Sequence, residues 1–114
     1  MLHAMSYVTL DEFKKLEIKI GHILSAEKVA DTDKLLKLSV DMGEETPRQI
    51  ISGISAYFLD PQILVGKKCA FATNLEPRTI RGFESQGMIL AVSGDSFFSL
   101  LETLPEVTPG STVK

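Results

Sequence analysis

The sequence predicts an all-β fold, a five-stranded Greek-key barrel with short flanking helices, from three observations. Residues 36–42 alternate between apolar and polar side chains, which is typical of a half-buried strand. Four further segments have strand composition and are separated by turn-forming residues. Helix signals are confined to two short segments, one before the first strand and one between the third and fourth. A small sandwich and an α+β sheet are the structural alternatives.

A short helix is predicted at residues 9–16, ahead of the first strand. Thr9 or Asp11 can cap this helix, and its apolar residues recur every third position on one face. The residues that follow, 18–24, alternate as a strand does, but Gly21 interrupts the alternation. We therefore expect a β-bulge or a sharp bend at Gly21.

The second and third strands are predicted to form a hairpin. The alternating segment 36–42 is followed by turn residues at 43–47 and then by the strand-like segment 48–54. Asp60, which precedes a proline, marks the start of a short helix, and Gly66 ends it after one or two turns.

The fourth and fifth strands are predicted at 67–75 and 88–92, with a loop that contains Pro77 between them. The segment 97–104 is too apolar for a free linker, and we expect it to pack on the barrel or on a second copy. Five strands with a short helix between the third and fourth match the layout of the OB-type barrel.

The composition is that of one globular domain, which we place at residues 6–114. The chain has 114 residues and a mass of 12.5 kDa, with 44% hydrophobic and 24% charged residues. Residues 1–5 resemble a vector remnant or an alternative start and are left out of the fold prediction. No apolar run approaches the ~18 residues of a membrane span, and the pattern of a signal peptide is missing. The sequence therefore predicts a cytoplasmic protein with no membrane partner.

The sequence contains no recognisable catalytic or metal-binding motif. The single cysteine, Cys69, excludes an internal disulfide and a cysteine-cluster zinc site within one chain. The two histidines, His3 and His22, are too far apart in sequence to support a metal pair. Gly82 and Gly87 lack the Lys-Ser/Thr pair that completes a phosphate loop. We therefore predict no metal, no cofactor and no enzymatic activity.

The net charge is −3 and the pI about 5.3, which disfavours a nucleic-acid partner, but the charge is unevenly distributed. Residues 67–88 contain four basic and two acidic residues, whereas the rest of the chain contains eight basic and thirteen acidic ones. A mildly basic segment therefore lies on an acidic body.

That segment includes the most informative stretch, residues 73–88. Arg78 and Arg81 supply two guanidinium groups, and Asn74 and Ser85 supply shorter polar groups. Arginine and short polar side chains on a loop suit contacts with phosphates, ribose hydroxyls and base edges. A solvated hairpin loop is the alternative interpretation of the same residues.

Motifs spread over nearly the whole chain resemble the tRNA-binding domain family. This domain forms the C-terminal domain or β subunit of many methionyl-tRNA synthetases and also occurs as stand-alone, structure-specific tRNA-binding proteins. The matching segments keep a consistent order and spacing and are residues 13–21, 33–35, 40–43, 51–54, 64–67, 74–78 and 82–88.

The resemblance implies an OB barrel, usually dimeric, that grips the outer corner of the tRNA L-shape without reading the anticodon. It further implies a non-catalytic module that assists methionyl-tRNA synthetase as an appended domain, a subunit or a trans-acting cofactor. Its partners would be tRNA, the catalytic body of the synthetase and a second copy in a homodimer. Carried over position by position, the resemblance implicates six tRNA-binding residues: Lys34, Asn74, Arg78, Arg81, Ser85 and Met88.

Several of these residues also have a purely structural interpretation. Lys34 can pair with nearby aspartates, and Arg81 can reach a neighbouring glutamate. Asn74 suits a turn with positive φ, and Ser85 can bond the local backbone. Met88 opens an apolar strand and can belong to the core.

The apolar segment near the C-terminus predicts a dimer interface formed by Phe97, Phe98, Leu100 and Leu101. A dimerisation module is therefore a further functional possibility, compatible with tRNA binding. The alternative function within the same family is a dimeric protein-export chaperone that binds apolar peptides through exposed hydrophobic surface.

Two departures from the family pattern affect the expected strength of tRNA binding. Glu76 and Thr79 stand where many relatives have lysine, and the chain as a whole is acidic. Fewer cationic contacts lower both the affinity and its salt dependence. We therefore expect weak, micromolar-range binding by one copy, strengthened when two copies or a synthetase body engage the same tRNA.

Overall fold

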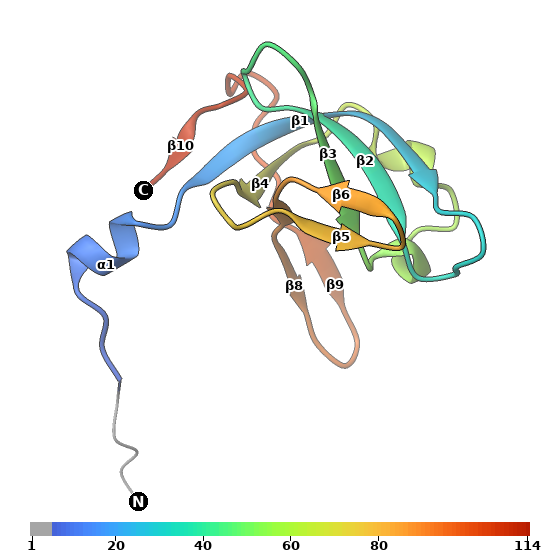
Figure 1. Cartoon of the computed structure of the whole chain (residues 1–114), viewed down its shortest axis with the longest axis horizontal. Coiled ribbons are helices and arrows are strands. Elements are labelled where there is room, and N and C mark those ends of the chain that lie inside the picture. The colour runs from blue at the N-terminus through green and yellow to red at the C-terminus, as the bar shows by residue number, and fades with distance from the viewer. Residues whose placement is uncertain (1–5) are drawn as a thin grey trace, which may run out of the picture.

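The structure is a computed structural model that describes residues 6–114 (Figure 1). Residues 1–5, which the sequence prediction sets aside, lie outside the described part. Five strands follow one another in an antiparallel sheet of order β3–β2–β1–β4–β7. Their bounds are β1 Ile18–Lys28, β2 Leu36–Asp41, β3 Arg48–Ser52, β4 Lys68–Ala72 and β7 Met88–Ile89.

The sheet curls until its two ends meet, and this closes a barrel. The Gln86 N–H donates to the Gln49 carbonyl at 2.8 Å, and the Ile51 N–H donates to the Ser85 hydroxyl at 2.9 Å. These bonds join β3 to the residues just before β7. The all-β fold of the OB type, predicted from the strand pattern, is confirmed.

The alternation seen in the sequence of β2 builds the core. Leu36, Leu38 and Val40 are fully buried, and the residues between them are half-exposed on the outer face. Phe71 from β4 and Leu64 fill the same core. Leu64 belongs to the 3-10 helix η2 Pro61–Leu64, which lies where the sequence predicts a short helix between Asp60 and Gly66. A second 3-10 helix, η1 Ser55–Tyr57, precedes it and was not predicted.

Gly21 does not form the bulge that the sequence predicts. It pairs in register with Cys69, and the shift in register occurs instead between Ile23 and Ser25. A Cβ at Gly21 would lie 2.5 Å from a methyl carbon of Val40. The glycine is therefore needed because core side chains pack directly against its backbone. The prediction was wrong because glycine can serve packing as well as backbone bending.

The N-terminal helix α1, Leu10–Lys14, lies outside the barrel (Figure 1). Thr9 caps it by a reciprocal capping box, in which the Glu12 N–H donates to the Thr9 hydroxyl at 3.0 Å. No residue of α1 is buried, and its apolar side chains Leu10 and Phe13 are exposed. The predicted helix is present, but its apolar side chains are not buried against the rest of residues 6–114.

The segment after β7 packs on the barrel. β8 Ala91–Ser93 and β9 Phe98–Leu100 form a hairpin, and β10 Thr112–Val113 pairs with β1. The predicted strand 88–92 is therefore interrupted at Leu90, where the chain turns into the hairpin. In the described part of the chain, no helix has the length and apolar character needed to cross a bilayer.

Candidate nucleic-acid interface

Residues 73–87 leave the barrel as an excursion between β4 and β7 that ends in a hairpin. Its strands are β5 Arg78–Ile80 and β6 Phe83–Ser85, which form a two-stranded sheet with each other and with no other strand of residues 6–114. The two residues between them, Arg81 and Gly82, have φ of 53° and 84°. Positive φ at both positions defines the two-residue turn that matches the twist of paired strands. The sequence prediction of a loop missed this hairpin because its strands are only three residues long.

The hairpin exposes both of its arginines. Arg78 and Arg81 are exposed, and within residues 6–114 no hydrogen bond or ion pair joins either guanidinium group to another side chain. The pairing of Arg81 with Glu84 that the sequence allows is therefore not formed. Both guanidinium groups keep their donors available for an external anion.

Lys34 lies in the turn between β1 and β2. Figure 1 shows this turn at the same end of the barrel as the turn of the β5–β6 hairpin. Lys37 of β2 contacts the hairpin: its ammonium lies 4.7 Å from the centre of the Phe83 ring of β6. The Lys34 side chain is exposed, while its backbone N–H donates to the Thr32 hydroxyl at 3.2 Å. The Lys37–Phe83 contact thus brings the tip of the hairpin, where Arg81 lies, to the start of β2, which Lys34 precedes, whereas Arg78 lies at the base of the hairpin, opposite Ser85.

Three predicted residues, Arg78, Ser85 and Met88, line one small cleft of about 60 Å³ between the hairpin and the barrel. Met88 is 47% exposed, and Leu75 and Ile80 provide further apolar walls. Met88 therefore does not belong to the core.

Ser85 itself is 5% exposed, and its hydroxyl is committed to the protein. It accepts from the Ile51 N–H at 2.9 Å and donates to the Gly87 carbonyl at 3.0 Å. The alternative interpretation of Ser85, a hydroxyl that bonds the nearby backbone, is thus present in the structure. A contact between Ser85 and RNA stays a prediction.

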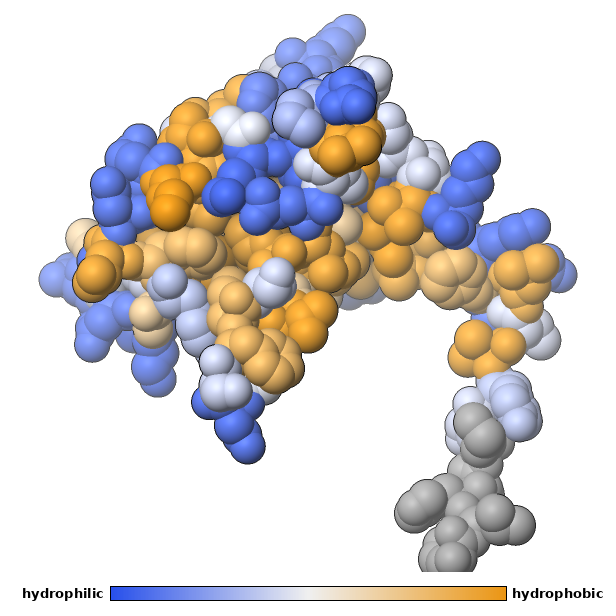
Figure 2. Space-filling model, turned by 180° about the vertical axis from the view of Figure 1, so that it is seen from behind, coloured by the Kyte–Doolittle hydropathy of each residue, from blue (hydrophilic) through white to orange (hydrophobic). Residues whose placement is uncertain are grey.

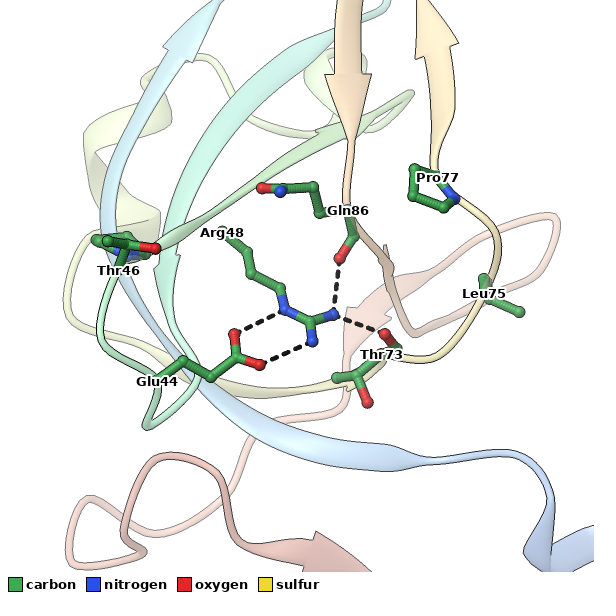
Figure 3. A pocket seen from close by; sticks show the side chains of 8 residues that line it. Glu44, Thr46, Arg48, Thr73, Leu75, Pro77 and Gln86 are labelled. Atoms are coloured by element: carbon green, nitrogen blue, oxygen red, sulfur yellow. Dashed lines mark hydrogen bonds and ion pairs between the residues drawn. The ribbon is translucent and has the colours of Figure 1, made fainter.

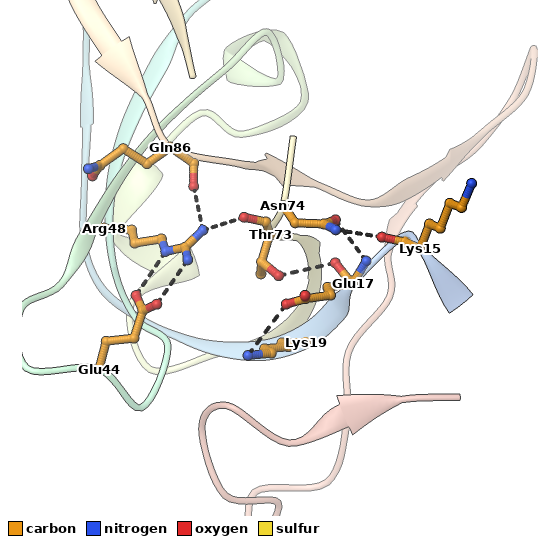
Figure 4. Close-up of polar contacts among 8 residues, drawn as sticks. All are labelled: Lys15, Glu17, Lys19, Glu44, Arg48, Thr73, Asn74 and Gln86. Atoms are coloured by element: carbon orange, nitrogen blue, oxygen red, sulfur yellow. Dashed lines mark hydrogen bonds and ion pairs between the residues drawn. The ribbon is translucent and has the colours of Figure 1, made fainter. Parts of the chain in front are cut away.

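Asn74 also uses its side chain within the protein (Figure 4). Its amide oxygen accepts from the Glu17 N–H at 2.8 Å, and its amide nitrogen donates to the Lys15 carbonyl at 2.5 Å. The neighbouring Thr73 N–H donates to the Glu17 carbonyl at 2.8 Å. Asn74 therefore joins the start of the excursion to the segment between α1 and β1. Its assignment as an RNA contact stays a prediction.

Sequence reasoning missed Arg48, which holds both ends of the excursion (Figure 3). Its Nη1 donates to the carbonyls of Thr73 at 2.6 Å and Gln86 at 3.0 Å. Its Nε and Nη2 donate to the two carboxylate oxygens of Glu44 at 2.8 and 2.9 Å. These hydrogen bonds hold the pKa of Glu44 below its usual value and raise the pKa of Arg48. No sequence signal brings residues so distant along the chain together.

Glu44, Arg48, Leu75, Pro77 and Gln86 also line an open recess of about 380 Å³ beside the excursion (Figure 3). The recess carries both signs of charge, because the Glu44 carboxylate covers one edge of the Arg48 guanidinium. Among the described residues, no cluster of metal-ligating side chains is present.

A family model described as "Putative tRNA binding domain" matches residues 18–112. The chain belongs to the tRNA-binding domain family. The family predicted from the sequence motifs is thus confirmed.

Relatives within the tRNA-binding domain family include two methionine–tRNA ligases. That of Methanoregula boonei is 50% identical over 107 residues, which is 94% of this chain and 16% of the ligase. That of Caldanaerobacter subterraneus is 40% identical over 109 residues, 96% of this chain and 17% of the ligase. The chain therefore spans about a sixth of the length of these relatives.

Two solved structures share the fold over nearly the whole chain. The MetRS-related protein from Pyrococcus horikoshii has a TM-score of 0.90 and 39% identity, covering 96% of this chain and 100% of that one. The chaperone CsaA from Bacillus anthracis has a TM-score of 0.83, with 96% and 100% of the chains covered. At 23% identity, the likeness to CsaA concerns the fold alone.

Proposed function

We propose that this protein is a non-catalytic tRNA-binding module, selective for the shape of the tRNA outer corner. It would assist methionyl-tRNA synthetase as an appended domain, as a subunit or in trans. The observation that carries the proposal is the β5–β6 hairpin, which presents Arg78 and Arg81 without internal partners. Membership of the tRNA-binding domain family and the similarity to methionine–tRNA ligases support it. A cytoplasmic location stays a prediction.

The geometry supports two kinds of RNA contact on this surface, one with phosphates and one with a base. Arg78, Arg81 and Lys34 supply cations for phosphates, which position the RNA without reading its sequence. Met88 and the apolar walls of its cleft supply a surface on which an unstacked base can lie. Glu76 and Glu84 lie in the same excursion and reduce its positive charge, so the affinity is expected to be micromolar at moderate salt.

Equilibrium binding of unfractionated tRNA and of an RNA hairpin, between ~50 and ~300 mM salt, tests this function. We expect a preference for tRNA and an affinity that falls steeply with salt. Arg78→Ala with Arg81→Ala should weaken binding about tenfold and lower the slope of log K against log salt by about 0.7–0.9 per lost contact. Lys114→Ala, which removes an exposed positive charge outside the excursion, is the matched control. Full affinity in the double arginine variant would remove the assigned site.

We also propose that the module is a homodimer. Phe97 and Leu101 are 58% and 42% exposed, and Figure 2 shows apolar side chains gathered over the β8–β9 hairpin and over α1. Phe98 stacks on Tyr57 with ring centres 3.9 Å apart and is half-buried. Leu100 is only 7% exposed and packs in the core, so Phe97 and Leu101 would form most of the apolar surface of this interface.

Analytical ultracentrifugation tests the dimer and locates its interface. Phe97→Glu should shift the protein toward monomer if the β8–β9 hairpin forms the interface. Leu10→Glu makes the matched change on the exposed face of α1. Loss of the dimer in Leu10→Glu alone would place the interface on α1, and a monomeric unmodified protein would refute the dimer.

The exposed apolar side chains also favour a second function, the dimeric export chaperone that binds apolar peptides. Tyr57, Leu59 and Ile63 are 54%, 100% and 62% exposed on η1, η2 and the residues between them. Apolar binding survives high salt, whereas phosphate binding does not. Peptide binding that persists in salt, together with no binding of tRNA at ~50 mM salt, would favour the chaperone.

A further inference from the structure

We propose that Arg48 is a positioning residue for the RNA-binding hairpin, which acts through the ends of the excursion and not by touching RNA. This inference rests on the proposed tRNA-binding function. It concerns a strand residue that neither the sequence motifs nor the family match singles out as functional.

The guanidinium group of Arg48 bonds to both ends of the excursion at once. One nitrogen, Nη1, donates to the Thr73 carbonyl, where the excursion begins, and to the Gln86 carbonyl, where it ends. Within the described residues, no other side chain hydrogen-bonds to both ends (Figures 3 and 4). Arg48 therefore fixes the spacing between the two ends from the barrel side.

The hairpin needs this support because its own strands are short. β5 and β6 pair with each other and form a separate two-stranded sheet. An isolated two-stranded hairpin is marginally stable in water, so its direction depends on the anchors at its ends. The Ser85 and Gln49 contacts hold β6 to β3, while Arg48 connects the end of the excursion at Gln86 to its start at Thr73. Without Arg48, the hairpin would have to be ordered when RNA binds, and affinity would fall.

Arg48 is poorly suited to contact RNA directly. Its side chain is 23% exposed, and Glu44 occupies its outer edge through two hydrogen bonds. Four of the five N–H groups of a guanidinium are thus used within the protein. The Glu44 carboxylate, whose side chain is 45% exposed, would repel a phosphate that approached this edge.

The arrangement requires arginine and its carboxylate partner. A planar guanidinium can donate to two carbonyls on one side and to both oxygens of Glu44 on the other. A lysine ammonium has three donors on a flexible stem and cannot span these acceptors in one plane. Arg48→Lys keeps the charge, so it separates geometry from electrostatics.

The test measures tRNA affinity across ~50–300 mM salt for the unmodified protein and for Arg48→Ala, Arg48→Lys and Arg78→Ala. We expect both Arg48 variants to bind about tenfold more weakly, with the same salt slope as the unmodified protein. Arg78→Ala should lose affinity and about 0.7–0.9 of a unit of slope. A matching loss of slope in Arg48→Ala would mean that Arg48 touches phosphate, and unchanged affinity would mean that it has no role. Either result overturns the inference.

Glu44→Ala provides a test of opposite sign and covers the case in which the Arg48 variants do not fold. If Glu44 were only a negative charge near the RNA, its removal would strengthen binding. If Glu44 orients Arg48, its removal should weaken binding about threefold despite the gain in net charge. Stronger or equal binding by Glu44→Ala would contradict the positioning role.

Hydrogen exchange of the free protein keeps this inference separate from the proposed function. Backbone amides of residues 73–87 should exchange faster in Glu44→Ala and Arg48→Lys, while those of β1 and β2 stay protected. Unchanged exchange in the excursion would overturn the positioning role even if tRNA binds. Absence of tRNA binding by the unmodified protein would refute the proposed function instead.

Discussion

Ser85→Ala is expected to destabilise the fold without removing an RNA contact. Ser85 is 5% exposed, and its hydroxyl bridges the Ile51 N–H and the Gly87 carbonyl at 2.9 and 3.0 Å. Alanine removes both bonds and leaves the Ile51 N–H, in a buried part of β3, without its acceptor. A buried unsatisfied donor costs about 1–3 kcal/mol, so we expect the free energy of unfolding to fall by about 2 kcal/mol.

Urea unfolding followed by circular dichroism measures this change, because the chain has no tryptophan. With a slope of about 1–3 kcal/mol per M urea, the midpoint should fall by about 1 M. Ser93→Ala, at an exposed position in β8, is the matched control and should change the free energy by less than about 0.5 kcal/mol.

Two results would refute this reasoning about Ser85. A loss of less than about 0.5 kcal/mol would mean that the hydroxyl does not close the barrel. A tenfold loss of tRNA affinity in a variant that is fully folded would mean that the hydroxyl contacts RNA. We expect the folded variant to bind tRNA within about twofold of the unmodified protein.

Three further predictions concern the core, the cysteine and acid stability. Gly21→Ala would place a Cβ 2.9 Å from the Phe71 ring, so it should lower the free energy of unfolding by at least about 2 kcal/mol; an unchanged thermal midpoint would refute the packing argument. Burial raises the pKa of Cys69 to about 11, so iodoacetamide at pH 8 should modify it only slowly until urea is added, and rapid native modification would contradict its burial. The hydrogen bonds from Arg48 lower the pKa of Glu44 below its unfolded value, so their stabilisation is present above the unfolded pKa and is lost as pH falls through the folded pKa. Urea midpoints between pH 6 and 3 should therefore fall less for Glu44→Gln than for the unmodified protein, and parallel curves would contradict the linkage.

The strand pattern and the sites predicted from the sequence depend on different kinds of information. Alternation in β2 predicts which side chains are buried because side chains point to opposite faces in turn. The same argument fails at Gly21, whose role depends on Val40 across the barrel. It fails again at Arg48, because its bonds to Thr73 and Gln86 exist only once the barrel has closed. Local pattern therefore predicts elements, while sites made by distant residues require the structure.

The motif around the hairpin combines residues that would contact RNA with residues that hold the hairpin in place. Arg78 and Arg81 are exposed and have no partner among residues 6–114. Asn74 and Ser85 instead bond the backbone next to the excursion, Asn74 at Lys15 and Glu17 and Ser85 at Ile51. An arginine binds a phosphate more tightly when the backbone that carries it is already ordered. Otherwise the free-energy cost of ordering that backbone on binding reduces the affinity. The spacing between the polar residues follows from where the excursion leaves and rejoins the barrel. This explains how a short motif can be specific for a family even though only some of its residues would meet the ligand.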